Sequence, residues 1–225
     1  MKGFVTSIGR EDIAEYLSKQ INCFYPDSDV VRKTDIQSAL SIAMDRIETC
    51  FEKIELPYYR QGSMSYFNHL NGDHYSMFLY IISNELYKNQ KINIATKVFL
   101  LNKALFGVDA FYSISLPNYF LFVHPLGTVL GKASYSDYFV VYQRVTIGAN
   151  EAAEYPIFSE RTVLYSNSSV IGNCHIGTDF VLGANSSLIN TKVPHNSVVV
   201  GNYPAHVILN NKKKLINNFF SCGNK

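Results

Sequence analysis

Histidines, cysteines and carboxylates are the residue types of this chain that could carry acid–base, nucleophilic or metal chemistry. The four cysteines are far apart and include no C-x-x-C pair, so neither a zinc site nor a redox motif is indicated. No pair of the six histidines shows ligand spacing with carboxylates, and no metal site is predicted. His124 precedes Pro125 and the run Gly-Thr-Val-Leu-Gly. Taken alone, this context fits a structural histidine in a turn as well as a proton-transferring one.

The other histidines are weaker candidates for chemistry. His175 falls at the end of a six-residue repeat, a position that usually faces outward, and His195 and His206 are expected in surface loops. His69 and His74 flank an Asn-Gly-Asp sequence and are candidate contacts for an acceptor. The sequence contains neither a Walker loop nor a G-x-G-x-x-G turn.

The composition is that of a globular protein. The chain has 225 residues, enough for one large domain or two small ones, and 47% of them are hydrophobic. The net charge is +2 and the basic residues are scattered, which argues against a nucleic-acid-binding face. The N-terminus lacks the features of a signal peptide and no apolar stretch is long enough to span a bilayer, so we expect a cytoplasmic protein. The basic run Lys212–Lys214 is expected in a solvated tail rather than at a phosphate.

The first 107 residues predict helices, because their apolar side chains recur at helical spacing. The clearest stripe consists of Ile36, Leu40, Ala43, Ile47 and Phe51. Helices are predicted over residues 11–22, 33–54, 74–89 and 93–107. We expect Gly107 to end the last of them.

From Val108 onward the sequence repeats every six residues. An aliphatic residue returns without a break at Leu164, Val170, Ile176, Leu182 and Leu188. The same spacing links Tyr135, Val141 and Ile147 upstream. Small residues come four places after three of the aliphatic positions, at Ser168, Cys174 and Ser186. A period of six is neither that of a helix nor that of an ordinary strand.

A six-residue period predicts a triangular prism of short parallel strands. Each repeat forms one side, the aliphatic residue points to the axis, and glycine permits the tight corners. We therefore predict an α + β chain with an α-helical N-terminal domain over residues 1–107, a left-handed parallel β-helix of hexapeptide repeats over 108–208 and a tail over 209–225. One loop should protrude near residues 149–162.

Several motifs of the β-helical part occur in a characteristic order. HPLGTVLGKASYSDYFVVYQRVTIG contains H-x-x-G-x-V-x-G, two hexapeptides and Q-x-V-T-I-G, and later coils end in a G-x-P-A-like motif with one extra residue. This arrangement resembles the serine acetyltransferases, a family of hexapeptide-repeat acyltransferases, over residues 73–208. The resemblance implies acetyl-CoA as the acetyl donor and transfer of the acetyl group to a hydroxyl.

The resemblance also implies catalytic roles. His124 would be the general base and Asp109, fifteen residues earlier, the carboxylate that orients it. Because one turn of such a prism takes about eighteen residues, we expect Asp109 beneath His124, accepting its ring N–H. Asp73 begins an Asp-His-Tyr-Ser sequence similar to the family's D-K-Y-S and is expected to contact the acceptor amine, to cap a helix, or both. A backbone N–H or the Gln143 amide is the candidate oxyanion donor.

Small residues of the prism are the predicted contacts for acetyl-CoA, because this family binds the pantetheine arm along an edge between two subunits. Ala149, Ser166 and Ala184 are 17 and 18 residues apart and are expected to stack on one edge. The full predicted set is Gly148, Ala149, Ser166, Gly183, Ala184, Gly201, Pro204 and Ala205.

Departures from the family pattern concern the acceptor. The family has aspartate where this chain has Val123, and Arg-His where it has Glu154 and Tyr155. Because a glutamate would repel an amino-acid carboxylate, we expect a changed acceptor. The favoured hypothesis is a sugar or polysaccharide O-acetyltransferase, with Tyr138, Tyr142 and Tyr155 as candidate aromatic surfaces for the sugar.

Two alternatives stay open. A true serine O-acetyltransferase is favoured by Asp73 and opposed by the departures just described. A non-catalytic hexapeptide scaffold is opposed by the presence of both Asp109 and His124. The resemblance further implies a homotrimer or a dimer of trimers, with the active site between neighbouring subunits.

Overall fold

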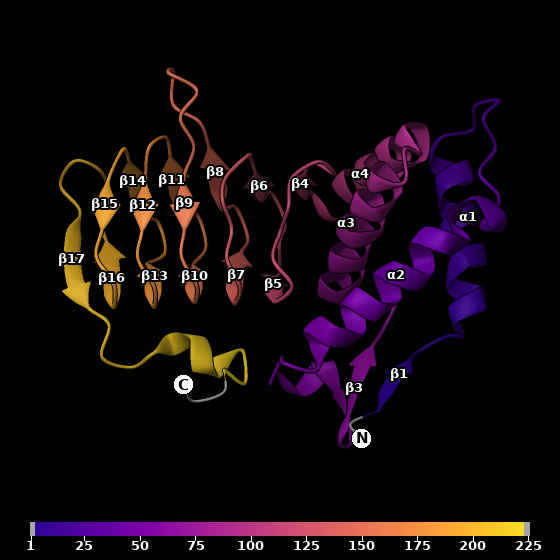
Figure 1. The fold of residues 1–225 in the computed structure, drawn as a ribbon, viewed down its shortest axis with the longest axis horizontal. Coiled ribbons are helices and arrows are strands. Elements are labelled where there is room, and N and C mark those ends of the chain that lie inside the picture. The colour runs from indigo at the N-terminus through magenta and orange to yellow at the C-terminus, as the bar shows by residue number, and fades with distance from the viewer. Residues whose placement is uncertain (1–2, 223–225) are drawn as a thin grey trace.

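The structure, a computed structural model, describes residues 3–222. A helical N-terminal half lies at one end of a parallel β-solenoid, and the last strand closes the other end (Figure 1). The helices are α1 (Arg10–Phe24), α2 (Lys33–Phe51), α3 (Gly72–Lys88) and α4 (Ile92–Phe106). The four predicted helices are thus confirmed, and Gly107 ends α4 in the left-handed conformation, with φ 65°. None of the helices described is long and apolar enough to cross a membrane.

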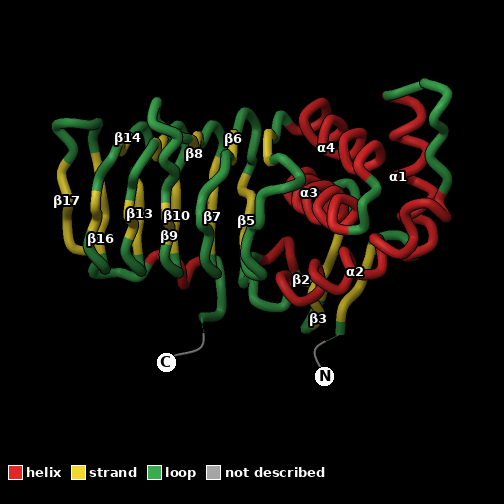
Figure 2. The backbone as a smooth tube through the Cα atoms, turned by 45° about the horizontal axis from the view of Figure 1, so that its top comes forward, coloured by secondary structure: helices red, strands yellow, loops and turns green. Residues whose placement is uncertain are grey.

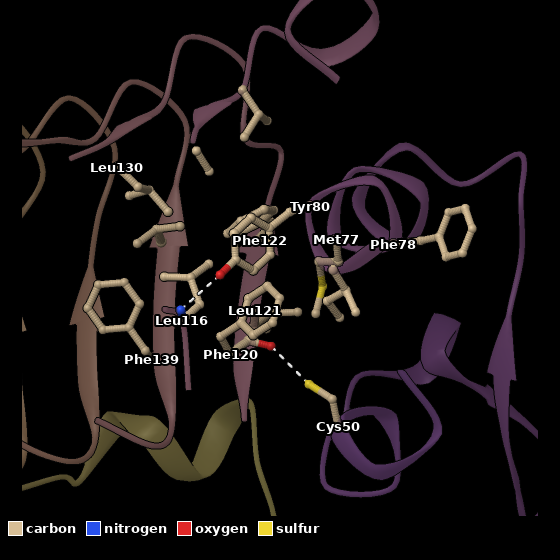
Figure 3. Close-up of a cluster of buried hydrophobic side chains, with 14 of the residues drawn as sticks. Cys50, Met77, Phe78, Tyr80, Leu116, Phe120, Leu121, Phe122, Leu130 and Phe139 are labelled. Atoms are coloured by element: carbon tan, nitrogen blue, oxygen red, sulfur yellow. Dashed lines mark hydrogen bonds between the residues drawn. The ribbon is translucent and has the colours of Figure 1, made fainter. Parts of the chain in front are cut away.

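The helices pack on one another and on the first coil of the solenoid. All five residues of the predicted α2 stripe are buried. Figure 3 shows two hydrogen bonds that anchor the first coil: the Cys50 thiol donates to the carbonyl of Phe120 (3.2 Å), and the Tyr80 hydroxyl accepts the N–H of Leu116 (2.9 Å). The position of α3 relative to the solenoid is therefore fixed by polar contacts as well as by apolar burial.

A small sheet that the sequence did not predict lies beside the helices. It contains β1 (Phe4–Thr6), β3 (Met64–Phe67) and β2 (Arg60–Gln61) in that order, and a single 3₁₀ turn, η1 (Pro57–Tyr59), precedes β2. Strands of two to four residues are too short to show a clear alternation in the sequence.

The solenoid has three faces (Figures 1 and 2). The first face contains β5 (Phe120–Val123), β7 (Phe139–Tyr142), β10 (Thr162–Leu164), β13 (Phe180–Leu182), β16 (Ser197–Val200) and β17 (Val207–Asn210). The second face contains β4 (Asp109–Ala110), β6 (Val129–Leu130), β8 (Thr146–Gly148), β11 (Ser169–Ile171) and β14 (Ser187–Ile189). The third face contains β9 (Ile157–Phe158), β12 (His175–Ile176) and β15 (Lys192–Val193). Neighbouring strands are parallel except β16 and β17, so the predicted β-helix is confirmed as a parallel solenoid of about five turns.

The six-residue repeat fills the axis of the solenoid. The five consecutive aliphatic residues from Leu164 to Leu188 are at most 2% exposed, and the three small residues are buried beside them. The corners differ from the prediction, because Gly148 and Gly183 do not adopt left-handed backbone angles. At the edge that leads into the first face, the left-handed residues are Tyr138, Arg161, Asp179 and Asn196, with φ between 55° and 66°. Asparagine and aspartate tolerate this conformation without glycine.

One coil is longer than the others. Thr146 pairs with Ser169, 23 residues later, whereas Ser169 pairs with Ser187, 18 residues later. The difference is the loop that protrudes between β8 and β9 (Figure 1). Residues 17 or 18 apart across this loop therefore do not share an edge of the solenoid.

The C-terminal segment folds back along the solenoid toward the helices (Figure 1). It contains the 3₁₀ turn η2 (Leu215–Asn218), and it buries Phe219 and Phe220 next to the rings of Tyr142 and Tyr138. The side chains of the basic run 212–214 are exposed, but the residues after it are packed. This segment covers part of the first face.

A glycine substitution tests the close stacking of coils. A Cβ at Gly177 would lie 2.6 Å from the backbone nitrogen of His195 and 2.7 Å from the backbone carbon of Pro194. Because backbone atoms cannot yield without moving a coil, Gly177→Ala should lower the free energy of unfolding by about 1–3 kcal/mol. The matched control Gly148→Ala should cost less, since its Cβ would meet Ile171 Cδ1 at 3.5 Å. Urea unfolding measures both, and equal losses would contradict the packing described.

Candidate active site

His124 begins an expanded turn at the edge between the first and second faces. Val123 pairs with Tyr142 and Val129 pairs with Thr146. The chain therefore advances six residues from Val123 to Val129 but only four over the equivalent turn of the next coil, from Tyr142 to Thr146. The His124 backbone is left-handed (φ 48°) and its side chain is 77% exposed. The two extra residues place the imidazole outside the solenoid edge, where a substrate can reach it.

Asp73 connects this turn to the helical half. Its Oδ1 accepts the backbone N–H of His124 (3.0 Å) and lies 3.8 Å from the imidazole Nδ1. Burial raises the pKa of Asp73 from its ordinary value, and the hydrogen bond from His124 partly opposes that rise. The N-cap of α3 is Asn71, whose side-chain oxygen accepts the N–H groups of Asp73 and His74. The Asp73 carboxylate does not cap the helix and is available to the site.

Asp109 does not lie beneath His124 as predicted. It pairs with Val129 in the second face, and its Oδ2 forms an ion pair with Lys103 (2.6 Å). In the described part of the chain, the carboxylate within 4 Å of the His124 ring is that of Asp73. The physical reason is the expanded turn: His124 lies before the second face begins, so Val129 is the residue that stacks on Asp109.

A row of residues continues from His124 along the same edge. Continuing the strand pairing of the first face past the strand ends aligns His124 with Gln143, Ser166 and Ala184. Hydrogen bonds accepted by the backbone carbonyls of Gln143 and Ser166 hold the row together. The side-chain oxygen of Gln143 is buried and has no hydrogen-bond partner among residues 3–222. The Gln143 amide thus lies one coil from His124, and its oxygen is unpaired within the described residues.

Ala149 does not join this row, contrary to the prediction. Gly148 pairs with Ile171 in the second face, which places Ala149 at the opposite edge of that face. The expected stacking of Ala149 on Ser166 fails because the longer coil lies between them. Ser166 and Ala184, which are separated by a coil of ordinary length, do stack.

The remaining predicted donor contacts lie farther along the solenoid. Gly183 comes directly before Ala184, and a Cβ there would approach the Val199 carbonyl oxygen at 3.2 Å. The exposed residues Gly201, Pro204 and Ala205 form the connection between β16 and β17. The row that starts at His124 therefore leads toward the end of the solenoid that is remote from the helices (Figure 1).

Glu154 and Tyr155 lie in the protruding loop, across the second face from His124. One chain therefore does not bring them to His124. The two carboxylate oxygens of Glu154 accept hydrogen bonds from the side-chain amides of Asn150 (2.6 Å) and Asn173 (3.0 Å). Glu154 thus fastens the loop to its base.

The two histidines near the Asn-Gly-Asp sequence are engaged by the protein. His74 is buried, its Nδ1 accepts the N–H of Asn68 (3.0 Å), and its ring centroid lies 4.0 Å from that of Tyr59. Burial lowers the pKa of His74 to about 3. His69 is hydrogen-bonded to the Ser7 hydroxyl (2.7 Å). Residues 3–222 contain no cluster of histidine, cysteine or carboxylate side chains arranged to hold a metal.

Tyr58 and Tyr142 lie near Asp73, and of these two the sequence predicted only Tyr142, as a candidate aromatic surface. The rings of Tyr142 and Tyr165 lie 5.0 Å apart in successive coils. Burial, and to a lesser extent the neighbouring Tyr165, Tyr58 and Asp73, together raise the pKa of Tyr142 to about 12. The signal in the sequence is that Tyr142 and Tyr165 hold equivalent positions in successive coils, directly before Gln143 and Ser166.

Comparison with known sequences points to one family. No family model matches the chain. The chain is similar to the serine acetyltransferase of Staphylococcus xylosus, with 25% identity over 145 residues that cover 63% of this chain and 66% of the relative. It is also 25% identical to that of Staphylococcus epidermidis over 138 residues, 60% of this chain and 64% of the relative. The chain thus spans just under two thirds of the length of these curated relatives.

Comparison with solved structures gives the same result. Serine acetyltransferase from Neisseria gonorrhoeae in complex with serine has a TM-score of 0.68 and 20% identity, covering 90% of this chain and 84% of that one. The Brucella abortus enzyme in complex with coenzyme A has a TM-score of 0.67 and 14% identity, covering 91% and 83%. The fold and site define a hexapeptide-repeat β-solenoid protein with a helical N-terminal half. More particularly, the chain is similar to the serine acetyltransferases.

The hypothesis of sugar or polysaccharide O-acetylation is wrong, because these relatives and structural neighbours are serine acetyltransferases. The structure explains why the departures misled. The Glu154 carboxylate accepts hydrogen bonds from the amides of Asn150 in its own loop and of Asn173 in the next coil. Tyr138 and Tyr142 are packed against Phe220 and Phe219 and do not form an open platform for a sugar ring.

The burial of His74 predicts a pH dependence of stability. Its pKa is about 3 in the folded chain and 6.5 for an ordinary histidine, so below pH 6.5 the unfolded chain binds a proton that the folded chain does not. The free energy of unfolding should therefore fall as the pH drops from 6.5 toward 3, with a limiting slope of about 1.4 kcal/mol per pH unit.

Urea unfolding at a series of pH values checks this expectation. His74→Gln should flatten the profile, whereas His175→Gln, at an exposed position, should leave the profile as in the wild type. The raised pKa of Asp73 acts in the opposite direction, because the contribution of Asp73 to the free energy of unfolding decreases as pH rises. The Asp73 contribution is the same in wild type and His74→Gln, so the difference between their profiles reports on His74. Parallel profiles for wild type and His74→Gln would show that His74 is not held neutral.

Proposed function

We propose that this chain is an acetyl-CoA-dependent serine O-acetyltransferase. The observation that carries the proposal is the exposed imidazole of His124, projecting from an expanded turn that Asp73 holds in place. The similarity to serine acetyltransferases, including structures in complex with serine and with coenzyme A, supports the two substrates. An imidazole with a free ring nitrogen can act as the general base that deprotonates a hydroxyl.

In the proposed reaction, His124 accepts the proton of the serine hydroxyl as its oxygen attacks the thioester carbonyl of acetyl-CoA. A C–O bond forms, and the Gln143 amide or a backbone N–H stabilises the negative charge on the carbonyl oxygen. The C–S bond then breaks, and His124 returns the proton to the coenzyme A thiolate. The Asp73 carboxylate, 3.8 Å from the ring, stabilises the imidazolium between these steps.

We propose that the acetyl-CoA arm follows the row from Gln143 through Ser166 and Ala184. Small side chains in this row allow a ligand to approach the backbone. The row ends near the connection that contains Gly201, Pro204 and Ala205, the proposed contacts for the adenine end. Gly183 lies beside it, whereas Gly148 and Ala149 lie at the other edge of the second face and would reach the donor only from a neighbouring copy.

Enzymatic assay tests the reaction and its base. Thiol release from acetyl-CoA should require L-serine, and His124→Ala should lower kcat by about 10²- to 10⁴-fold while acetyl-CoA binding persists. Asp109→Asn serves as the matched control for Asp73→Asn and should cost less, because Asp109 is paired with Lys103. Absence of serine-dependent thiol release would reject the function and favour a non-catalytic scaffold. Wild-type turnover by His124→Ala would reject the base.

We propose that the chain assembles as a homotrimer or a dimer of trimers through the second face. An uncharged row on this face, Val129, Thr146, Ser169 and Ser187, runs across four paired strands. Its edges carry His124 on one side and the protruding loop on the other. Contact through this face would bring the loop of one copy toward His124 of the next.

Light scattering tests the assembly. The wild type should have the mass of three or six copies of the 25.4 kDa chain. Ser169→Lys should dissociate it, because a charge would be buried in the middle of the interface. Ser28→Lys, at an exposed position of the helical half, should not. A fully active monomer would rule out a shared site.

A further inference from the structure

We propose that the hydroxyl of Tyr142, together with that of Tyr58, binds the carboxylate of the acceptor amino acid. This inference rests on the proposed function and names the residues that select the acceptor. Residues 149–156, the loop after β8, contain no lysine or arginine and so offer no cation for an acceptor carboxylate.

Tyr142 stands beside the residue that bears the base. It pairs with Val123, which directly precedes His124. Because Val141 is buried in the axis of the solenoid, Tyr142 points outward on the first face. Asp73 approaches the same turn from α3. The phenol, the carboxylate and the imidazole thus converge from three elements.

The ring of Tyr142 is fixed before any ligand binds. Tyr165 packs on one side at 5.0 Å between centroids, and Phe219 contacts it edge-on at 6.2 Å and 77°. Phe219 is itself held by its carbonyl, which accepts the N–H of Glu55 (2.8 Å). A hydroxyl on a ring held in this way loses little conformational entropy on binding a ligand.

The polar groups around this point have unused hydrogen-bonding capacity. Asp73 Oδ1 accepts the His124 N–H, and Oδ2 has no partner among residues 3–222. The hydroxyls of Tyr58, Tyr142 and Tyr165 likewise form no hydrogen bond with the rest of the described chain. The hydrogen bonds that Tyr142 and Tyr165 do form there involve their backbone atoms. Unpaired donors and an unpaired acceptor gathered beside an exposed base are what a small polar ligand requires.

The charges of these groups match an α-amino acid. Tyr142 lies near Tyr58 and Asp73 and remains a neutral donor at physiological pH. Asp73 Oδ2 can accept the ammonium group, and the tyrosine hydroxyls can donate to the carboxylate. The side-chain hydroxyl then faces His124. A carboxylic acid without an ammonium group would meet the Asp73 charge uncompensated, so the arrangement selects zwitterions.

A substrate comparison isolates the proposed contact. Tyr142→Phe removes one oxygen and keeps the ring, and kinetics are measured with L-serine and with L-serinamide, which lacks the carboxylate charge. We expect kcat/KM for serine to fall by about 10- to 100-fold, mainly through KM, because a hydrogen bond to a charged group is lost. The constants for serinamide and the KM for acetyl-CoA should stay within about twofold of the wild type. Tyr58→Phe should show the same selectivity with a smaller loss.

Tyr138→Phe is the matched control. Tyr138 directly precedes β7, at the opposite end of that strand from Tyr142, and its ring is stacked on that of Tyr119 at 5.1 Å between centroids. Tyr138→Phe should leave the kinetic constants for both substrates unchanged. If Tyr142→Phe lowered kcat/KM equally for serine and serinamide, or for neither, this inference would be overturned. Turnover of serine by the wild type would still support the proposed function. A wild type without serine-dependent thiol release would instead reject the proposed function itself.

Discussion

The hydrogen bond from the His124 backbone N–H to Asp73 Oδ1 is the interaction on which the site depends. It joins the N-terminal turn of α3 to the expanded turn that begins at His124, and the two bonded residues are 51 positions apart in the sequence. Burial raises the pKa of Asp73, and the hydrogen bond from the His124 N–H and the nearby His124 ring oppose that rise. The same group therefore orients the turn and supplies the negative charge of the site.

Placing that carboxylate requires the helical half to be rigid against the solenoid. Asn71 caps α3 and leaves the Asp73 side chain free. Tyr80, two turns further along α3, accepts the Leu116 N–H and donates to the Ile114 carbonyl. Phe220 of the C-terminal segment forms an isolated antiparallel β-bridge with Ile54, and the neighbouring Phe219 packs against the ring of Tyr142. Elements from three regions of the sequence thus hold the helical half against the first coils of the solenoid.

The sequence predicted the parts that follow a period. Helical spacing located the four helices, and the six-residue repeat identified the residues of the solenoid axis, because a buried side chain is needed at each turn regardless of detail. Spacing failed where the chain departs from its period. The expanded turn at His124 separates it from Asp109, and the longer coil separates Ala149 from Ser166. A count of residues cannot tell on which coil an insertion lies or which face absorbs it.

The predicted sugar acceptor is wrong for a different physical reason. The sequence does not show which groups pair with Glu154, so the prediction treats Glu154 as an unpaired anion that faces a substrate. In the fold its two oxygens are occupied by the amides of Asn150 and Asn173, and it stabilises a loop across the second face from His124. What a site repels or attracts is set by the groups left unpaired after folding. Among residues 3–222, the groups left unpaired beside His124 are the second oxygen of Asp73 and the hydroxyls of the neighbouring tyrosines.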